Sequence, residues 1–197
     1  TRWLVRENSK VYDKLNHIVV HPPVRAEKHH TNKGDCITLV NVSKLKGSEM
    51  FYKLVNAFPD AKFLAVEGAY ENQDLRDLKN VEIVKHTSDM PGDVWSRTKI
   101  LLMPSEYESY GMAGVEALAS GIPVIASATT GLVEALSYSG IFVDKDDTDG
   151  WVEALRDLLE DEEAYESASY LASKRSKEIN PDEELRNWVN AVEKLVE

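Results

Sequence analysis

The sequence has little of what several classes of protein depend on. Only one of its 197 residues, Cys36, is a cysteine, so no disulfide can form within the chain, and no Cys/His cluster has zinc-ligand spacing. No apolar run approaches the roughly 20 residues that a membrane-spanning helix needs. The 23 lysines and arginines are outnumbered by 34 aspartates and glutamates, and a net charge of −11 argues against a nucleic-acid partner. These absences favour a cytoplasmic protein with no structural metal and no transmembrane segment.

The length and composition of the chain suit one globular domain with a full hydrophobic core. Hydrophobic residues make up 43% of the chain and charged residues 29%, which is ordinary for such a domain. The sequence begins at Thr1 rather than at methionine, and no signal peptide stands at its start. We therefore expect it to be a piece cut from a longer protein.

Short apolar runs alternate with helical patterns along the middle of the chain. Each run is continuous rather than alternating, which is typical of strands buried on both faces of a parallel sheet. The pattern predicts six strands, at residues 36–42, 62–66, 81–84, 100–103, 123–126 and 140–143. It indicates an α/β protein with a doubly wound parallel sheet and flanking helices, in which ligands bind at the loops that follow the strands.

The two ends of the chain lie outside this pattern. Residues 1–24 combine helical spacing with the stiff segment His21-Pro22-Pro23, and we interpret them as a linker helix and an inter-domain segment. Residues 25–180 form the predicted domain. Within it, residues 25–34 are polar and predict a mobile surface loop rather than a metal site. Residues 181–197 carry an apolar stripe that begins after a proline, which predicts a separate C-terminal helix.

The most informative stretch runs from Pro104 to Ser127. It follows an apolar strand and opens a helix near Gly111, with Glu108 before that helix and Glu116 eight positions later. Both carboxylates are expected to face a ligand above the start of the helix, where free amides supply donors. A carboxylate accepts two hydrogen bonds side by side, which suits the vicinal hydroxyls of a ribose or hexose. The helix dipole alone also favours acidic residues there, so Glu116 by itself indicates little about function.

Taken as a whole, this stretch resembles the E-x7-E signature of retaining glycosyltransferases with two Rossmann-like domains, the GT-B architecture. Gly131 and Glu134 extend the resemblance, as does the segment from Gly140 to Asp144. The residues of the signature that match in register are Pro104, Glu108, Tyr110, Gly111, Glu116, Ala117, Ala119, Gly121, Pro123 and Val124.

A second part of the resemblance lies in the loop after the first predicted strand. Lys46 and Gly47 match the lysine and glycine with which the family holds the donor diphosphate. The family's usual arginine is absent: Asn41 stands near its place, and whether Lys44 substitutes for it stays open. Without the resemblance, Lys46 would be interpreted as a solvated loop lysine.

The resemblance implies that the chain is the Rossmann-like, donor-binding C-terminal half of a GT-B enzyme. The parent protein would transfer a sugar from a UDP-, GDP- or ADP-sugar to an acceptor, with retention and without a metal or other cofactor. The chain alone would be inactive without its amino-terminal acceptor-binding domain, and residues 181–197 would be the helix that crosses back to that domain. The catalytic residues implied are Glu108 and Lys46. The donor-binding residues implied are Asn41, Gly47, Ser109, Tyr110, Gly111, Met112 and Glu116.

Two alternatives remain. The chain could be a non-catalytic nucleotide-sugar-binding module, for which the departure at Asn41 is the best support. A nucleotide-sugar epimerase shares the two-domain plan, although the segment from Glu108 to Glu116 fits that group poorly. Tyr107 and Tyr110 also have two interpretations, because either ring suits a sugar face or packing under the loop.

Overall fold

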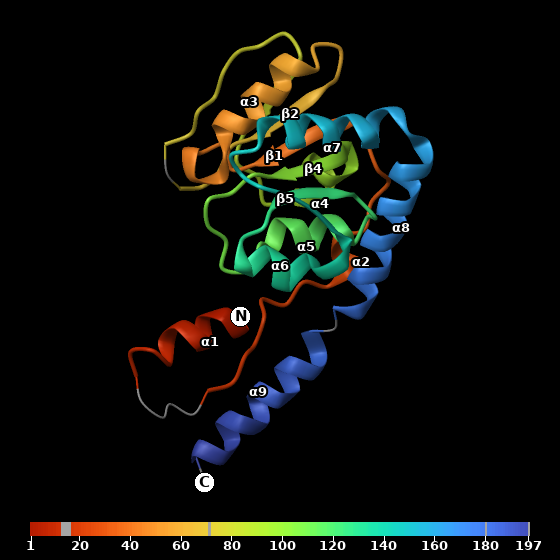
Figure 1. The fold of residues 1–197 in the computed structure, drawn as a ribbon. Coiled ribbons are helices and arrows are strands. Elements are labelled where there is room, and N and C mark those ends of the chain that lie inside the picture. The colour runs from red at the N-terminus through yellow and green to blue at the C-terminus, as the bar shows by residue number, and fades with distance from the viewer. Residues whose placement is uncertain (13–16, 71, 180, 197) are drawn as a thin grey trace.

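The computed structural model describes residues 1–12, 17–70, 72–179 and 181–196. Its centre is a six-stranded sheet in which every paired neighbour is parallel, with the order β3-β2-β1-β4-β5-β6 (Figure 1). This confirms the predicted doubly wound α/β class. The strands are β1 (Cys36–Val40), β2 (Phe63–Val66), β3 (Val81–Val84), β4 (Thr98–Met103), β5 (Val124–Ser127) and β6 (Gly140–Val143).

The burial of the strands follows from their place in the sheet. β2 and β5 are buried along their whole length, whereas the edge strands β3 and β6 are partly exposed. The strand order reverses between β1 and β4, which lie side by side at the centre. In open α/β sheets, ligands bind in the crevice beyond the carboxyl ends of the strands at such a reversal.

β2 and β5 differ from the predicted bounds by one residue, and β1 and β4 differ by two for identifiable reasons. β1 ends at Val40 instead of residue 42, because Asn41 has a left-handed backbone with φ 65°. β4 begins at Thr98 instead of residue 100. The hydroxyl of Thr98 is fully buried against that of Thr38 at 2.8 Å, so a polar residue extends a strand that the apolar pattern had placed later.

Helices cover both faces of the sheet (Figure 1). On one face, α3 (Ser48–Ala57) and α7 (Thr148–Glu160) bury Phe51 and Trp151 completely. On the other face, α5 (Met112–Leu118) and α6 (Thr130–Leu136) pack on the sheet. α8 (Glu162–Glu178) contributes to both clusters. The rule that a parallel sheet buries both faces is therefore met.

Both ends of the chain leave this core. α1 (Arg2–Asn8) and α9 (Pro181–Val196) extend away from the sheet (Figure 1). The linker helix expected within residues 1–24 is α1, which ends at Asn8, and residues 13–16 lie outside the described part. Glu197, the predicted last residue of the C-terminal helix, also lies outside it. Among the described helices, none combines the length and apolar character needed to cross a membrane.

The prediction of a mobile loop at residues 25–34 is wrong in part. α2 (Ala26–His29) forms there and packs against α5. His30 Nδ1 lies 2.9 Å from the carbonyl oxygen of Ala119, and the Thr31 amide donates to Ser120 Oγ at 2.8 Å. The segment is held by tertiary contacts that its polar composition does not reveal. One more short helix, α4 (Met90–Asp93), precedes β4.

Candidate functional site

A cavity of about 330 Å³ opens at the carboxyl ends of β1 and β4, where the strand order reverses. Its floor is formed by the ends of the two strands and its walls by the loops that follow them. Seven of the predicted site residues line it, and the described lining residues include Asn41, Lys46, Ser105, Glu108, Ser109, Tyr110, Gly111, Met112 and Ala113.

Two of the residues that line this cavity form an ion pair. Lys46 Nζ donates to Glu108 Oε1 at 2.6 Å, and their side chains are 26% and 13% exposed. Ser105 Oγ donates to the same carboxylate oxygen at 3.3 Å. Lys46 ends a short 3-10 turn after β1, whereas Glu108 lies in the loop after β4. The structure thus brings together the two residues to which the family resemblance gives catalytic roles.

Gly47 fixes the position of the lysine loop. Its backbone is left-handed, with φ 84°, and a Cβ atom there would lie 2.3 Å from the carbonyl oxygen of Pro104. No side chain fits that approach, so glycine is required. The Glu106 amide donates to the carbonyl of Leu45 at 3.0 Å and holds the two loops together. Gly47 lines a smaller neighbouring cavity rather than the one that holds Lys46.

The opposite wall is the start of α5. Gly111 precedes the helix with φ 90°, a conformation suited to glycine. Met112 and Ala113 open the helix at the cavity, and the first amides of a helix have no partner within it. Tyr110, only 6% exposed, completes this wall, and burial raises the pKa of its hydroxyl. This wall presents hydrogen-bond donors to the cavity.

Asn41 also lines the cavity, and its side chain is fixed by Gln73, a residue that the sequence did not indicate. Its Oδ1 accepts a hydrogen bond from Gln73 Nε2 at 2.9 Å, while Gln73 Oε1 accepts one from the Gly68 amide, also at 2.9 Å. Gln73 thereby joins the loops after β1 and β2. Asn41 itself has a left-handed backbone, a conformation in which asparagine is enriched, but nothing in the sequence indicates its contact with Gln73.

Glu116 is placed differently from the other predicted site residues. It does not belong to the described lining of the cavity, and its Oε2 lies 3.8 Å from His29 Nδ1 on α2. Burial raises the pKa of the Glu116 carboxyl, against the opposing effects of His29 and of the Trp95 indole N–H. In this conformation the carboxylate points to α2, so the expected pairing of two carboxylates around one ligand is not formed. Its ribose-binding role stays a prediction.

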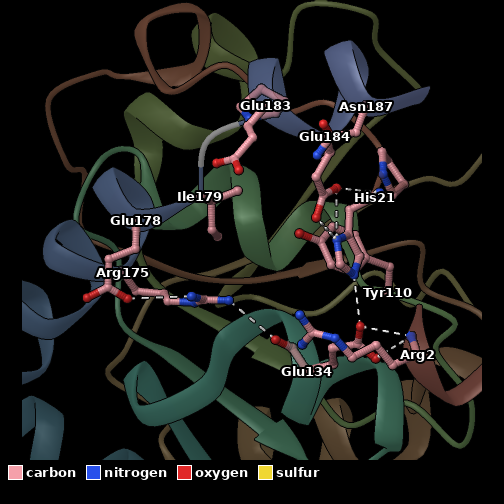
Figure 2. A pocket seen from close by; sticks show the side chains of 12 residues that line it. Arg2, His21, Tyr110, Glu134, Arg175, Glu178, Ile179, Glu183, Glu184 and Asn187 are labelled. Atoms are coloured by element: carbon pink, nitrogen blue, oxygen red, sulfur yellow. Dashed lines mark hydrogen bonds and ion pairs between the residues drawn. The ribbon is translucent and has the colours of Figure 1, made fainter. Parts of the chain in front are cut away.

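A second cavity, of about 390 Å³, shares the lining residue Tyr110 with the first (Figure 2). His21, Glu134 and Glu184 meet there, although they are far apart in the sequence. In the sequence His21 belongs to the stiff segment His21-Pro22-Pro23, and nothing in that local pattern indicates these contacts. Within the described residues, no group of three or more histidines, cysteines, aspartates or glutamates is arranged to hold a metal ion.

The comparisons with known proteins agree with this geometry. The family model described as "Glycosyl transferases group 1" matches residues 26–175. The capsular polysaccharide biosynthesis glycosyltransferase CapM of Staphylococcus aureus is 25% identical over 166 residues, which cover 76% of this chain and 43% of CapM. The chain spans less than half the length of the first curated relatives that it matches.

Two solved structures show the same fold at low sequence identity. Anabaena HepE, in complex with UDP and glucose, superposes with a TM-score of 0.76 and 14% identity, over 88% of this chain and 56% of HepE. The C-terminal domain of the group 1 glycosyl transferase LpcC from Francisella tularensis superposes with a TM-score of 0.64 and 15% identity, over 79% of this chain and 97% of that domain. The chain therefore belongs to the glycosyl transferases group 1 family and has the fold of a GT-B C-terminal domain.

Proposed function

We propose that the cavity between the ends of β1 and β4 binds a nucleoside diphosphate sugar, and that the parent protein transfers the sugar to an acceptor with retention. The observation that carries the proposal is the ion pair between Lys46 and Glu108 across a cavity at the strand-order reversal. The structure of HepE with UDP-glucose supports it, because that protein has the same fold.

In this proposal Lys46 and Glu108 each leave the other for a group of the donor when the donor binds. Lys46 turns from Glu108 to the diphosphate, and Glu108 accepts hydrogen bonds from the sugar hydroxyls. Two unit charges 4 Å apart attract by about 4 kcal/mol at an effective dielectric constant near 20. A diphosphate carries more negative charge than one carboxylate, so the exchange of partners by Lys46 is favourable.

Catalysis would then come from charge that is in place before the reaction. Negative charge grows on the leaving diphosphate, and Lys46 together with the first amides of α5 would stabilise it. Glu108 would position the sugar relative to the acceptor. No metal ion takes part in this scheme, and we assign no covalent nucleophile within the chain.

The test is a thermal-shift screen of the chain with UDP-, GDP- and ADP-sugars. A nucleotide that binds the folded state only raises the melting temperature in a concentration-dependent way. We expect one base to give a larger shift than the other two. No shift with any of the three at millimolar concentration would contradict donor binding.

A non-catalytic nucleotide-sugar-binding module is the second candidate function. Asn41 near the place of the family's arginine favours it, and so does the contact of Glu116 with His29 in place of the cavity. The two functions are distinguished by whether the parent protein transfers a sugar to an acceptor. If that protein binds a sugar nucleotide tightly but releases no glycosylated product with any acceptor, the module is the correct description.

A further inference from the structure

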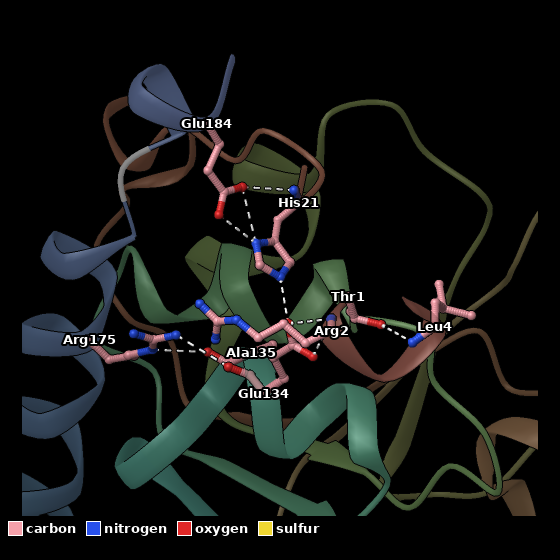
Figure 3. Close-up of polar contacts among 8 residues, drawn as sticks. All are labelled: Thr1, Arg2, Leu4, His21, Glu134, Ala135, Arg175 and Glu184. Carbon is pink, nitrogen blue, oxygen red and sulfur yellow. Dashed lines mark hydrogen bonds and ion pairs between the residues drawn. The ribbon is translucent and has the colours of Figure 1, made fainter. Parts of the chain in front are cut away.

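His21 is held between two carboxylates that come from different helices (Figure 3). Its Nε2 lies 2.8 Å from Glu134 Oε1 on α6, and its Nδ1 lies 2.8 Å from Glu184 Oε1 on α9. The backbone amide of His21 also donates to Glu184 Oε2 at 2.8 Å. The segment before the core, the core itself and the C-terminal helix therefore meet at one imidazole.

This geometry requires a particular protonation state. A carboxylate only accepts hydrogen bonds, so each ring nitrogen of His21 must carry a proton to make its bond. Only the positively charged imidazolium has both protons. When it loses one proton, one of the two contacts loses its hydrogen and its charge attraction.

The surrounding charges come from α1, α8 and α9, and they are shown in Figure 2. Arg2 on α1 donates its backbone amide to Glu134 at 2.9 Å. Arg175 on α8 donates to the carbonyl oxygens of Ala135 and Glu134 and lies 3.5 Å from Glu178. Glu183 on α9 also lines the cavity, and the Tyr110 ring covers the face of the imidazole.

The two carboxylates are ionised in this setting. Burial alone would raise the pKa of Glu134, but the amide of Arg2 and the His21 ring lower it below the ordinary value. Burial acts in the same direction on Glu184, and the amide and ring of His21 lower its pKa as well. The side chains of His21 and Glu134 are only 15% and 12% exposed, so water screens this pair little.

The imidazole also contacts a residue that lines the proposed donor cavity. Its ring stacks on that of Tyr110, with centroids 4.7 Å apart and planes 25° apart. Tyr110 lines both cavities, and Pro22, the residue after His21, does so too. A shift of His21 would therefore move a wall of the donor cavity and the start of α9 together.

We propose that His21 is a positioning residue that couples the placement of α9 to the shape of the donor cavity through Tyr110, and that it does so only as the imidazolium. Its effect on α9 stands on the contacts described here, whereas its effect on the donor rests on the proposed function. Loss of the proton frees α9 from the core and loosens the Tyr110 wall.

The test measures amide hydrogen exchange of α9 in the whole chain between about pH 5 and pH 8, after correction for the intrinsic chemical rate. We expect the protection of the first turns of α9 to fall about tenfold as the imidazolium disappears, which corresponds to the loss of one charge-assisted hydrogen bond.

Two variants of adjacent residues on α9 serve as a matched pair. Glu184→Gln removes the charge that faces His21 and should lower α9 protection at pH 5 and flatten the pH dependence. Glu183→Gln removes the same charge one position away and should behave as the wild type. A pH-independent protection in the wild type, or an equal effect of the two variants, would overturn the coupling between His21 and α9.

Affinity for UDP, GDP and ADP, measured by calorimetry at pH 5.5 and pH 7.5, tests the donor part separately. We expect the nucleotide that binds to do so several-fold more tightly at pH 5.5 in the wild type, and the difference to shrink in Glu184→Gln. Equal affinities at both pH values, beside pH-dependent α9 exchange, would overturn the link through Tyr110. If no nucleotide binds at either pH, the proposed function fails, while the exchange data still decide the role of His21 at α9.

Discussion

Lys46 Nζ lies 2.6 Å from Glu108 Oε1, although 62 residues separate the two in the sequence. Their strands, β1 and β4, are neighbours at the centre of the sheet, and parallel strands bring the loops after them to one edge. The tight fit of Gly47 against Pro104 holds the lysine loop in place. The ion pair is thus a consequence of the strand order, and it occupies the position that the family resemblance gives to the donor.

Glu116→Gln should stabilise the fold at neutral pH and yet weaken nucleotide binding. Burial raises the pKa of the Glu116 carboxyl, so the folded state holds the proton over a pH range in which the unfolded state has lost it. Stability from this group is therefore present at acid pH and is lost as pH rises above the ordinary value of about 4.3 for a glutamate. Glutamine stays neutral and avoids that loss.

Thermal unfolding of both proteins at pH 4 and pH 7.5 checks the first half. The increase in melting temperature of Glu116→Gln over the wild type should be larger at pH 7.5 than at pH 4. Calorimetry with a nucleoside diphosphate checks the second half, where unpaired ribose hydroxyls should cost about 1–3 kcal/mol. Equal nucleotide affinity for both proteins would show that Glu116 belongs to the helix packing and not to ribose binding.

Gly47→Ala should lower the free energy of unfolding by about 1–3 kcal/mol, the usual cost of a non-glycine residue in a strained backbone region. The added Cβ would meet the backbone oxygen of Pro104 at 2.3 Å, and backbone cannot move aside cheaply. Gly114→Ala is the control, because its Cβ would meet the movable sulfur of Met103 at 2.9 Å. Urea unfolding measures both, and a smaller loss for Gly47→Ala than for Gly114→Ala would refute the role of this turn.

The chain alone should bind a nucleoside diphosphate weakly and transfer no sugar. A donor that is bound by this domain alone stays exposed to solvent. Water then screens the charge interactions that must strengthen in the transition state. Adding an amino-terminal acceptor-binding domain should restore transfer, followed by mass spectrometry of the acceptor. Product from the chain alone at a comparable rate would require an acceptor site within these residues.

The sequence predicted the sheet well because the buried central strands are apolar on both faces, and continuous runs such as the one in β2 leave little ambiguity. Its errors come from features with no local pattern. The left-handed backbone of Asn41 ends β1 early, and α2 is a four-residue polar helix that packs against α5. That helix brings His29 to Glu116.

Long-range polar contacts were the other part that sequence reasoning missed. His21 meets Glu134 and Glu184 across 113 and 163 residues, and neither spacing follows a helix or strand period. By contrast, Lys46, Glu108 and Gly111 were identified by their match to the family's motifs, and the apolar runs had located the strand ends that bring them to one cavity.

The most direct test of the central claim compares Lys46→Ala with Lys62→Ala by calorimetry, using the preferred nucleoside diphosphate and the matching nucleoside. Lys62 is a matched control because it is also paired with a carboxylate, that of Asp35. It directly precedes β2 and so lies at the amino ends of the strands, away from the cavity at their carboxyl ends. Lys46→Ala should lower affinity for the diphosphate about tenfold or more, with little change for the nucleoside, because a charge-assisted contact to phosphate is lost. Added salt should reduce the difference between the loss of diphosphate affinity and the loss of nucleoside affinity. Lys62→Ala should leave both affinities unchanged. An equal loss for diphosphate and nucleoside with Lys46→Ala, or no loss at all, would contradict a donor diphosphate in this cavity.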